Sequence, residues 1–241
     1  MASLAQFYFE GELAEGVVTP LDEQAARHIV QVLRRQPGDR VLLCDGRGRA
    51  AEAVITEAGK KKCTVQIHSV ALHKEPALLL HMGVAFTKNA SRNEWLLEKA
   101  TELGVRSIIP LSTARTEKEH LRYDRWKNIL VSAMLQSQQY YLPELTQPLP
   151  LATLAATYAG VEQKLLAHCI AGKKKAPLPV ALQPGKSALL LIGPEGDFTE
   201  EEVLLCEGHG FAGVSLGGQR LRTETAAMAA CAYFNMINHA E

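Results

Sequence analysis

The sequence predicts an α/β protein with two parts: a small antiparallel β-sheet or barrel over residues 1–72, and a mostly parallel sheet covered by helices over residues 73–241. Short apolar segments separated by glycine-containing turns dominate the first part, which is typical of antiparallel strands. After about residue 75, apolar strands alternate with amphipathic helices, the pattern of a parallel sheet with crossover helices. A chain of 241 residues is long enough for two such domains.

The first part is expected to contain three strands and one helix. The strands are expected at residues 40–44, 51–55 and 63–67. Asp22 is the expected N-cap of the helix, which ends at Arg34 and Arg35 before Pro37-Gly38. The apolar face of this helix consists of Ala25, Ile29, Val32 and Leu33.

The second part is expected to contain strands and helices in alternation. The strands are expected at residues 78–86, 105–111, 165–170, 188–192 and 213–216. The helices begin near residues 91, 124, 199 and 223, and residues 91–94 and 199–202 have the form of capping boxes. The first of these helices is expected to point Trp95, Leu96 and Leu103 inward. Residues 142–150 carry three prolines and are expected to form a loop.

Composition limits the classes of function. The 26 basic and 26 acidic residues give a formal net charge of zero, so any contact with nucleic acid must use a local patch of cations. No apolar run approaches the roughly 20 residues that cross a bilayer, and no signal peptide is visible, so a cytoplasmic protein is expected. The five cysteines are scattered without a C-x-x-C pair, which argues against disulfides and zinc and favours small core residues.

Two glycine-containing loops are the candidate ligand sites. Residues 191–196, Leu-Ile-Gly-Pro-Glu-Gly, leave the most apolar strand at the end where open α/β sheets bind ligands. Residues 216–226, Leu-Gly-Gly-Gln-Arg-Leu-Arg-Thr-Glu-Thr-Ala, place two arginines beside a helix start, which suits an anion or an electron-rich base. Each loop alone is also compatible with a plain turn or a capped helix start. Together they would form two walls of one pocket.

The two loops together resemble the signature of the ribosomal RNA small subunit methyltransferase E family, in the SPOUT superfamily. The resemblance extends over nearly the whole chain. Its further matches are residues 21–23, His28, residues 32–34, Gly38-Asp39, Asp45-Gly46, Lys88, Glu94, Lys99, residues 102–105 and Gln136-Ser137. The chain departs from the family pattern at Gln138-Gln139, where many members have Gly-Arg, and near Phe7, where many have an arginine.

This resemblance implies a homodimeric, S-adenosylmethionine-dependent enzyme without a metal. Residues 1–72 would form a PUA-like RNA-binding barrel, and residues 73–241 would form a SPOUT methyltransferase domain that ends in a trefoil knot. The substrate would be N3 of uridine 1498 in 16S rRNA, on the assembled small ribosomal subunit. The implied cofactor-binding residues are Leu111, Ile192, Gly193, Gly196, Leu216, Gly217, Leu221 and Thr223. Residues 110–112 would be a third wall, and a branched side chain at Gly193 or Gly196 is expected to enter the path of the cofactor.

The resemblance also suggests residues for catalysis and RNA binding. Arg222 would stabilise the negative charge that spreads to the uracil oxygens when N3 loses its proton. Glu224 or Glu195 would accept that proton, or would instead cap or orient the loops. The expected RNA-binding residues are Arg34, Arg115 and Arg220, and Lys118 is a further cation. Arg34 and Arg115 are preferred over the lysine clusters at 60–62 and 173–175.

Two other functions remain open from the sequence. One is a non-catalytic, dimeric RNA-binding module, which would not need two intact cofactor loops. The other is an enzyme acting on a small nucleotide-like molecule, which would have no affinity for RNA. Binding of S-adenosylmethionine, together with binding of RNA, therefore discriminates among the three functions.

Overall fold

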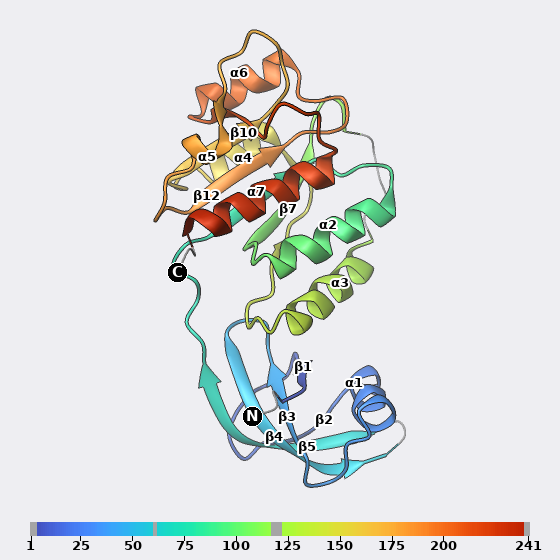
Figure 1. Cartoon of the computed structure of the whole chain (residues 1–241). Helices are drawn as coiled ribbons and strands as arrows, with labels where there is room; N and C mark the ends of the chain where they lie inside the picture. The colour runs from blue at the N-terminus through green and yellow to red at the C-terminus, as the bar shows by residue number, and fades with distance from the viewer. Residues whose placement is uncertain (1–3, 60–61, 117–121, 239–241) are drawn as a thin grey trace. The chain divides into compact units, whose positions relative to one another are not determined.

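The computed structural model describes residues 4–59, 62–116 and 122–238, and the chain divides into two compact units (Figure 1). The N-terminal unit comprises Met1–Glu75 together with Met134–Leu142. The C-terminal unit comprises Pro76–Ala133 and Pro143–Glu241. Among the helices of the described residues, none is both long and apolar enough to cross a membrane.

A five-stranded sheet with the order β1-β3-β4-β5-β2 forms the N-terminal unit. Its strands are β1 (Gln6–Tyr8), β2 (Val18–Pro20), β3 (Arg40–Cys44), β4 (Arg49–Ala58) and β5 (Cys63–Leu72). The three predicted strands are confirmed within β3, β4 and β5, which pair antiparallel. The pairing of β1 with β3 is parallel and was not predicted, because three residues carry no periodicity that could reveal it.

The predicted helix of this unit begins as expected but does not continue as a regular α-helix. The Asp22 carboxylate accepts a hydrogen bond from the Ala25 amide at 2.7 Å, which confirms the N-cap. α1 (Glu23–Arg27) then passes into a π-helical turn, η1 (His28–Val32). A π-helical turn contains more residues than an α-helical turn, so the side chains after it point in other directions around the helix axis than they would in a continuous α-helix. Ala25 and Ile29 are therefore buried, whereas the expected inward position of Val32, 68% exposed, is wrong.

The segment Met134–Leu142 packs on the sheet of the N-terminal unit, and it includes the residues that depart from the family pattern. The Gly48 amide donates to the Tyr140 carbonyl at 2.9 Å. The Tyr140 ring stacks on His73 with centroids 3.4 Å apart, and the Tyr141 hydroxyl donates to the His73 carbonyl at 2.8 Å. These two tyrosines therefore attach the segment Met134–Leu142 to the residues that surround His73 and Gly48 in this unit.

A parallel sheet with the order β11-β13-β10-β12-β6-β7-β8 forms the C-terminal unit, and β9 also pairs with β7. Its strands are β6 (Leu80–Val84), β7 (Ser107–Ser112), β8 (Glu144–Leu145), β9 (Leu149–Pro150), β10 (Gln163–Ala167), β11 (Ala176–Pro177), β12 (Ala188–Ile192) and β13 (Ala212–Ser215). Among the described residues these strands pair in parallel, which confirms the predicted sheet type. The expected loop at 142–150 is wrong, because β8 and β9 extend the sheet there.

Helices cover both faces of this sheet. They are α2 (Ala90–Glu102), α3 (Tyr123–Gln136), α4 (Leu151–Thr157), α5 (Leu178–Ala181), α6 (Glu200–Gly208) and α7 (Thr223–Asn238). α7 lies beside α2 and packs on β6 and β12 (Figure 1), whereas α4 packs against α6. Leu189 and Leu191 belong to a core cluster with residues of α4 and α6, so Leu190 between them faces the opposite side. This sandwich buries all five residues of β12.

Of the two predicted capping boxes of the C-terminal unit, one is present in the structure and the other is not. The capping box at Thr199 and Glu202 is confirmed, since the Glu202 amide donates to Thr199 Oγ1 and the Thr199 amide to the Glu202 carboxylate. The capping box expected at residues 91–94 is wrong. The Asn89 side chain caps α2 instead, by accepting from the Arg92 amide at 3.3 Å. Trp95 was expected inside but is 44% exposed.

Candidate functional site

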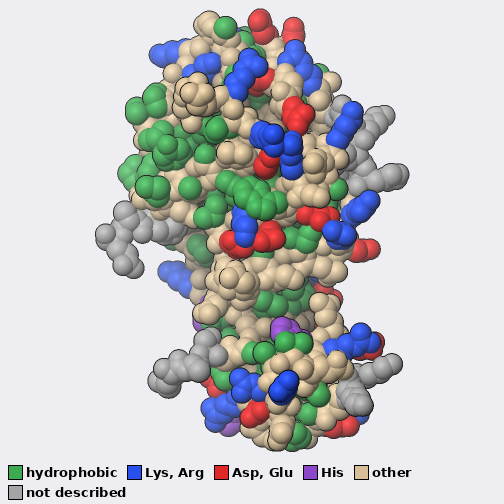
Figure 2. Space-filling model, turned by 45° about the vertical axis from the view of Figure 1, so that its right-hand side comes forward, with side chains coloured by type: hydrophobic (Ala, Val, Ile, Leu, Met, Phe, Trp, Pro, Cys, Tyr) green, Lys and Arg blue, Asp and Glu red, His purple; other side chains and the backbone are tan. Residues whose placement is uncertain are grey.

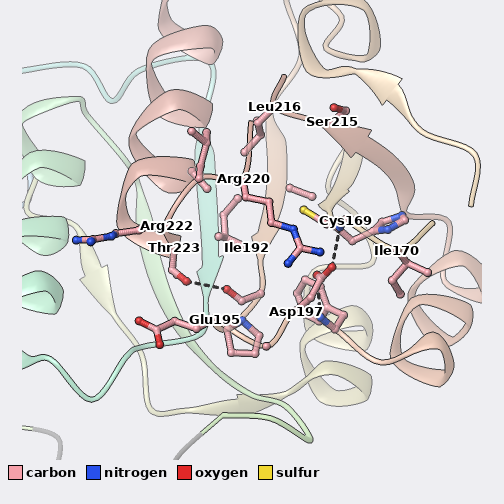
Figure 3. Close-up of a pocket in the computed structure, with 18 of the residues that line it drawn as sticks. Cys169, Ile170, Ile192, Glu195, Asp197, Ser215, Leu216, Arg220, Arg222 and Thr223 are labelled. Atoms are coloured by element: carbon pink, nitrogen blue, oxygen red, sulfur yellow. Dashed lines mark hydrogen bonds between the residues drawn. The ribbon is translucent and has the colours of Figure 1, made fainter. Parts of the chain in front are cut away.

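A cavity of about 830 Å³ opens at the carboxyl ends of three adjacent strands of the C-terminal unit. Ala167, Ile192 and Val214, near the ends of β10, β12 and β13, form its floor. Three segments form its walls: the β10 loop (residues 168–171), the β12 loop (residues 193–198) and the β13 loop (residues 215–222). Figure 3 shows the side chains of these loops converging on one hollow. This volume lies in the usual range of small-molecule sites.

The structure brings together most of the candidate site residues, which come from the two glycine loops and from Arg115. Those that line the cavity are Arg115, Ile192, Gly193, Glu195, Gly196, Leu216, Gly217, Arg220, Leu221, Arg222 and Thr223. Three candidates lie elsewhere. Leu111 is 2% exposed in the core, on a strand separated from β12 by β6, so residues 110–112 are not the third wall. Glu224 is buried behind the cavity wall, and Arg34 is exposed in the N-terminal unit.

The third wall is the β10 loop, which the sequence interpretation missed. β10 lies between β12 and β13 in the sheet, so the loop that follows it enters the same cavity. Cys169 of this loop is exposed, whereas the other four cysteines are buried as expected. His168 is 5% exposed, and neither ring nitrogen has a hydrogen-bond partner among the described residues. Burial lowers the pKa of this imidazole, which favours its neutral form.

Asp197 connects the β10 and β12 loops. One carboxylate oxygen accepts from the Cys169 amide at 2.7 Å, and the other accepts from the Phe198 amide at 2.8 Å. The residue has a φ of +63°, and its own amide donates to the Pro194 carbonyl, closing a tight turn. Asp and Asn tolerate this left-handed conformation better than most residues. The turn thereby fixes the backbone of Gly193 and Gly196 at the cavity.

Thr223 connects the β12 and β13 loops. Its hydroxyl donates to the Gly193 carbonyl at 3.1 Å, a buried bond that Figure 3 marks with a dashed line. Thr223 is also the first residue of α7, so the start of that helix is fixed to the end of β12. The three loops therefore form one bonded frame around the cavity.

The two glycines of the β12 loop differ in what a side chain would contact. A Cβ at Gly193 would lie 3.0 Å from two ring carbons of Phe198, so it would press on that buried ring. A Cβ at Gly196 would lie 3.1 Å from the Arg115 side chain, which is flexible. Packing against Phe198, which also lines the cavity, is thus a second reason for glycine at position 193, beside the expectation that a branched side chain there would block the ligand. The absence of a side chain at Gly193 allows the start of the β12 loop to lie against the Phe198 ring at its end.

Gly193→Ala is expected to reduce the free energy of unfolding of the C-terminal unit by about 1–3 kcal/mol, the usual cost of overpacking. Urea denaturation followed by tryptophan fluorescence measures this, because both tryptophans, Trp95 and Trp126, lie in this unit. Gly218→Ala is the matched control, since a Cβ there meets nothing within 4 Å and should change stability by less than about 0.5 kcal/mol. Equal effects of the two substitutions would contradict the contact with Phe198.

The cavity carries a local cluster of cations, which a chain of zero net charge would need for contact with nucleic acid. Four arginines line it, Arg92, Arg115, Arg220 and Arg222, against the two carboxylates Glu195 and Asp197. In Figure 3 the Arg220 side chain extends toward the side of Cys169 and Asp197, whereas Arg222 extends to the opposite side, that of Glu195. The excess of positive charge suits an anionic partner such as RNA.

The lysine clusters give weaker support for RNA binding. Lys173 pairs with Glu207 at 3.1 Å, and Lys62 pairs with Glu57 at the same distance. Lys60, Lys61 and Lys118 lie outside the described residues. Across the part of the chain that the structure describes, no group of three His, Cys, Asp or Glu side chains could hold a metal ion.

Comparison with protein families matches both parts of the chain. A model of the RNA methyltransferase domain matches residues 73–235, and a model of the RNA methyltransferase PUA domain matches residues 21–67. Curated relatives include ribosomal RNA small subunit methyltransferase E from Synechocystis, 29% identical over 94% of this chain and 75% of the relative. The protein of the same name from Bacillus subtilis is 28% identical over 89% of this chain and 88% of the relative.

Solved structures with this fold agree with the family matches. A structure described as a "probable rRNA-methyltransferase" from Porphyromonas gingivalis has a TM-score of 0.91 and 34% identity, covering 98% of this chain and 99% of that one. Ribosomal RNA small subunit methyltransferase E from Neisseria gonorrhoeae, bound to S-adenosyl methionine, has a TM-score of 0.82 and 27% identity, covering 98% of both chains. The N-terminal unit is thus PUA-like. The chain belongs to the family of RNA methyltransferases that includes ribosomal RNA small subunit methyltransferase E.

Proposed function

We propose that this protein is an S-adenosylmethionine-dependent enzyme that methylates N3 of uridine 1498 in 16S rRNA. The observation that carries the proposal is the convergence of both family-signature loops, with four arginines, on one cavity at the ends of β10, β12 and β13. The names of the relatives support ribosomal RNA of the small subunit as substrate, and the Neisseria structure supports the cofactor. The assembled small subunit, in the cytoplasm, is the proposed form of the substrate.

The cavity has the dimensions and lining that a nucleoside-sized cofactor needs. Ile192, Val214 and Leu216 offer apolar surface for an adenosine group, and the bonded loops offer backbone polar groups at fixed positions. The residues proposed to hold the cofactor are Ile192, Gly193, Gly196, Leu216, Gly217, Leu221 and Thr223. Leu111 is left out of this set, because its side chain is buried in the core.

When bound, the cofactor supplies an electrophilic methyl group: the bond from N3 to the methyl carbon forms as the carbon–sulfur bond breaks, leaving a neutral thioether, and the N3 proton must leave. Arg222, which lines the cavity, would stabilise the negative charge that develops on the uracil oxygens. Of the two candidate proton acceptors, Glu195 lines the cavity with a side chain 68% exposed, whereas the Glu224 side chain is 12% exposed. Geometry therefore favours Glu195.

RNA contacts are proposed for both parts of the chain. Residues 1–72 would form the PUA-like RNA-binding domain, with Arg34 exposed on it, and residues 73–241 the SPOUT methyltransferase domain. Arg115 and Arg220 would meet phosphate groups at the mouth of the cavity. Cationic contacts of this kind fix position, whereas the shape of the folded ribosomal particle would supply selectivity.

A trefoil knot is proposed for the C-terminal unit. β13 lies on the far side of β10 from β12, yet Thr223, which follows β13, bonds to Gly193, which follows β12. The chain after β13 thus returns past the end of β10 to reach the β12 loop. Threading of this returning segment through the β12 loop would make the knot.

A homodimer is proposed as the working form. Val180 of α5 and Met236 of α7 are 75% and 69% exposed, and these two helices pack against each other. Met228, Ala232 and Met236 recur every four residues along α7, which makes one apolar stripe. Figure 2 shows hydrophobic side chains gathered on one flank of the C-terminal unit. Burying such a surface against a second copy would remove it from water.

Primer extension on treated RNA tests the proposed function. Unmodified small subunits, and separately naked 16S rRNA, are incubated with protein and S-adenosylmethionine, and a primer is extended across the 3′ region. N3 lies on the pairing edge of uracil, so its methylation should stop reverse transcriptase next to uridine 1498, more strongly on subunits than on naked RNA. Methyl incorporation without a stop would show that another atom is modified.

Calorimetric titration with S-adenosylmethionine distinguishes the remaining functions. Heat of cofactor binding is expected, and its absence would favour a non-catalytic RNA-binding module. Cofactor binding without any affinity for RNA would favour an enzyme acting on a small molecule. Either result would contradict the proposal.

A further inference from the structure

Arg92 joins two carboxylates that are far apart in the sequence, and no sequence motif pointed to this role. It lies in the first turn of α2 and lines the cavity. Its Nη1 lies 3.3 Å from Glu195 Oε1, in the β12 loop, and donates a hydrogen bond to it. Its Nε lies 3.5 Å from Glu224 Oε1, in the first turn of α7. One guanidinium therefore connects α2, α7 and the β12 loop.

The exposed fraction of the three side chains increases from Glu224, in the interior, through Arg92 to Glu195, at the cavity. The exposed fraction of the side chain is 12% for Glu224, 30% for Arg92 and 68% for Glu195. Glu224 Oε2 is buried and has no hydrogen-bond partner among the described residues. A buried carboxylate that already faces a guanidinium is well placed to hold that guanidinium, and poorly placed to reach a substrate.

We propose that Arg92, anchored by Glu224, is a positioning residue that holds the Glu195 carboxylate at the cavity for proton acceptance from the substrate base. The inference rests on the proposed function and assigns separate roles in it to the two glutamates and to Arg92. In many active sites a catalytic base is oriented by a neighbouring side chain, which is itself held by a third, buried side chain. Glu195, Arg92 and Glu224 would have these three roles. A planar guanidinium with several donors can bond two carboxylates at once, which a lysine ammonium on its flexible stem does less well.

The charge of the group argues against the main alternative, that Arg92 binds an RNA phosphate directly. One arginine and two carboxylates sum to a net charge of −1, which repels a phosphate. The other arginines of the cavity, Arg115, Arg220 and Arg222, form no ion pair with a carboxylate of the described residues, so they suit that role better. Arg92 thus acts within the protein.

Single-turnover methyl transfer on saturating small subunits tests the inference. Glu195→Gln is expected to slow the step by about 10²-fold, the lower end of general acid–base contributions. Arg92→Gln should slow it by a similar factor, and Arg92→Lys should recover only part of the loss. The double variant Arg92→Gln/Glu195→Gln should be no slower than the slower single variant, because the two side chains act as one unit. The Michaelis constant for RNA should remain within about threefold.

A measurement that does not depend on activity tests the anchor. The effects of Arg92→Gln and Glu224→Gln on the urea midpoint, followed by tryptophan fluorescence, should be non-additive if the two side chains contact each other. Calorimetric affinity for S-adenosylmethionine should stay within about threefold in both variants. Arg125→Gln is the matched control, since Arg125 forms an ion pair with Glu94 at 2.6 Å outside the cavity, and it should leave the rate unchanged.

The outcomes separate this inference from the proposed function. Absence of methyl transfer by the wild-type protein would overturn both. An active wild type in which Arg92→Gln raises only the Michaelis constant for RNA would overturn the inference alone and identify Arg92 as a phosphate contact. Additive losses in the double variant would also overturn it, because they would mean that Arg92 and Glu195 act independently.

Discussion

Replacing Arg222 with alanine is expected to slow methyl transfer by about 10²–10³-fold, the effect of removing one preorganised group that stabilises charge in a transition state. Arg222 lines the cavity directly before Thr223, whose bond to Gly193 fixes the local backbone. Its side chain extends to the side where Glu195, the proposed proton acceptor, lies (Figure 3). Negative charge on the uracil oxygens appears only as the N3 proton leaves, so this contribution should fall on the rate.

Single-turnover rates and cofactor affinity together check this expectation. The affinity for S-adenosylmethionine, measured by calorimetry, should change by less than about threefold in Arg222→Ala, since the side chain is not proposed to hold the cofactor. Arg222→Lys keeps the positive charge and should recover part of the rate. Arg125→Ala removes an arginine outside the cavity and should have no effect. An unchanged rate in Arg222→Ala would remove this residue from the proposed mechanism.

The sequence could predict the two loops of the cavity because each carries a local signal. Glycines after an apolar strand, and arginines before a threonine at a helix start, are visible in neighbouring residues, and the structure places both loops at one cavity. The β10 loop carries no such signal. Its place between the other two follows from the strand order β13-β10-β12, which long-range pairing determines. The wall expected at residues 110–112 was misplaced for the same reason.

Arg92 and Asp197 show a second limit of sequence reasoning. Arg92 was interpreted only as part of a capping box, yet Asn89 caps the helix and Arg92 reaches carboxylates 103 and 132 positions later in the chain. Asp197 bonds to the Cys169 amide, from which 28 positions separate it. Both contacts depend on tertiary packing, and no periodicity or local spacing reveals them. Local caps at Asp22 and Thr199 were predictable because both partners lie within one turn.

The Phe198 side chain is expected to couple the stability of the C-terminal unit to cofactor binding. It is 1% exposed and belongs to a core cluster with residues of β12, α4 and α6. Its ring also contacts the start of the β12 loop, since the position of a Cβ on Gly193 is 3.0 Å from two of its carbons. Phe198→Ala should therefore reduce the free energy of unfolding by about 3–5 kcal/mol, the usual cost of truncating a buried phenylalanine.

Urea denaturation followed by tryptophan fluorescence measures this loss of stability. Under conditions in which the Phe198→Ala variant remains folded, calorimetry should show that it binds S-adenosylmethionine at least tenfold more weakly. Phe198→Leu keeps much of the volume and should lose less of both quantities. Leu204→Ala on α6 is the matched control, because Leu204 is 56% exposed and its truncation should change stability by less than about 0.5 kcal/mol. A large loss of stability with unchanged cofactor affinity would mean that the bonds of Asp197 and Thr223 hold the β12 loop without the ring beneath it.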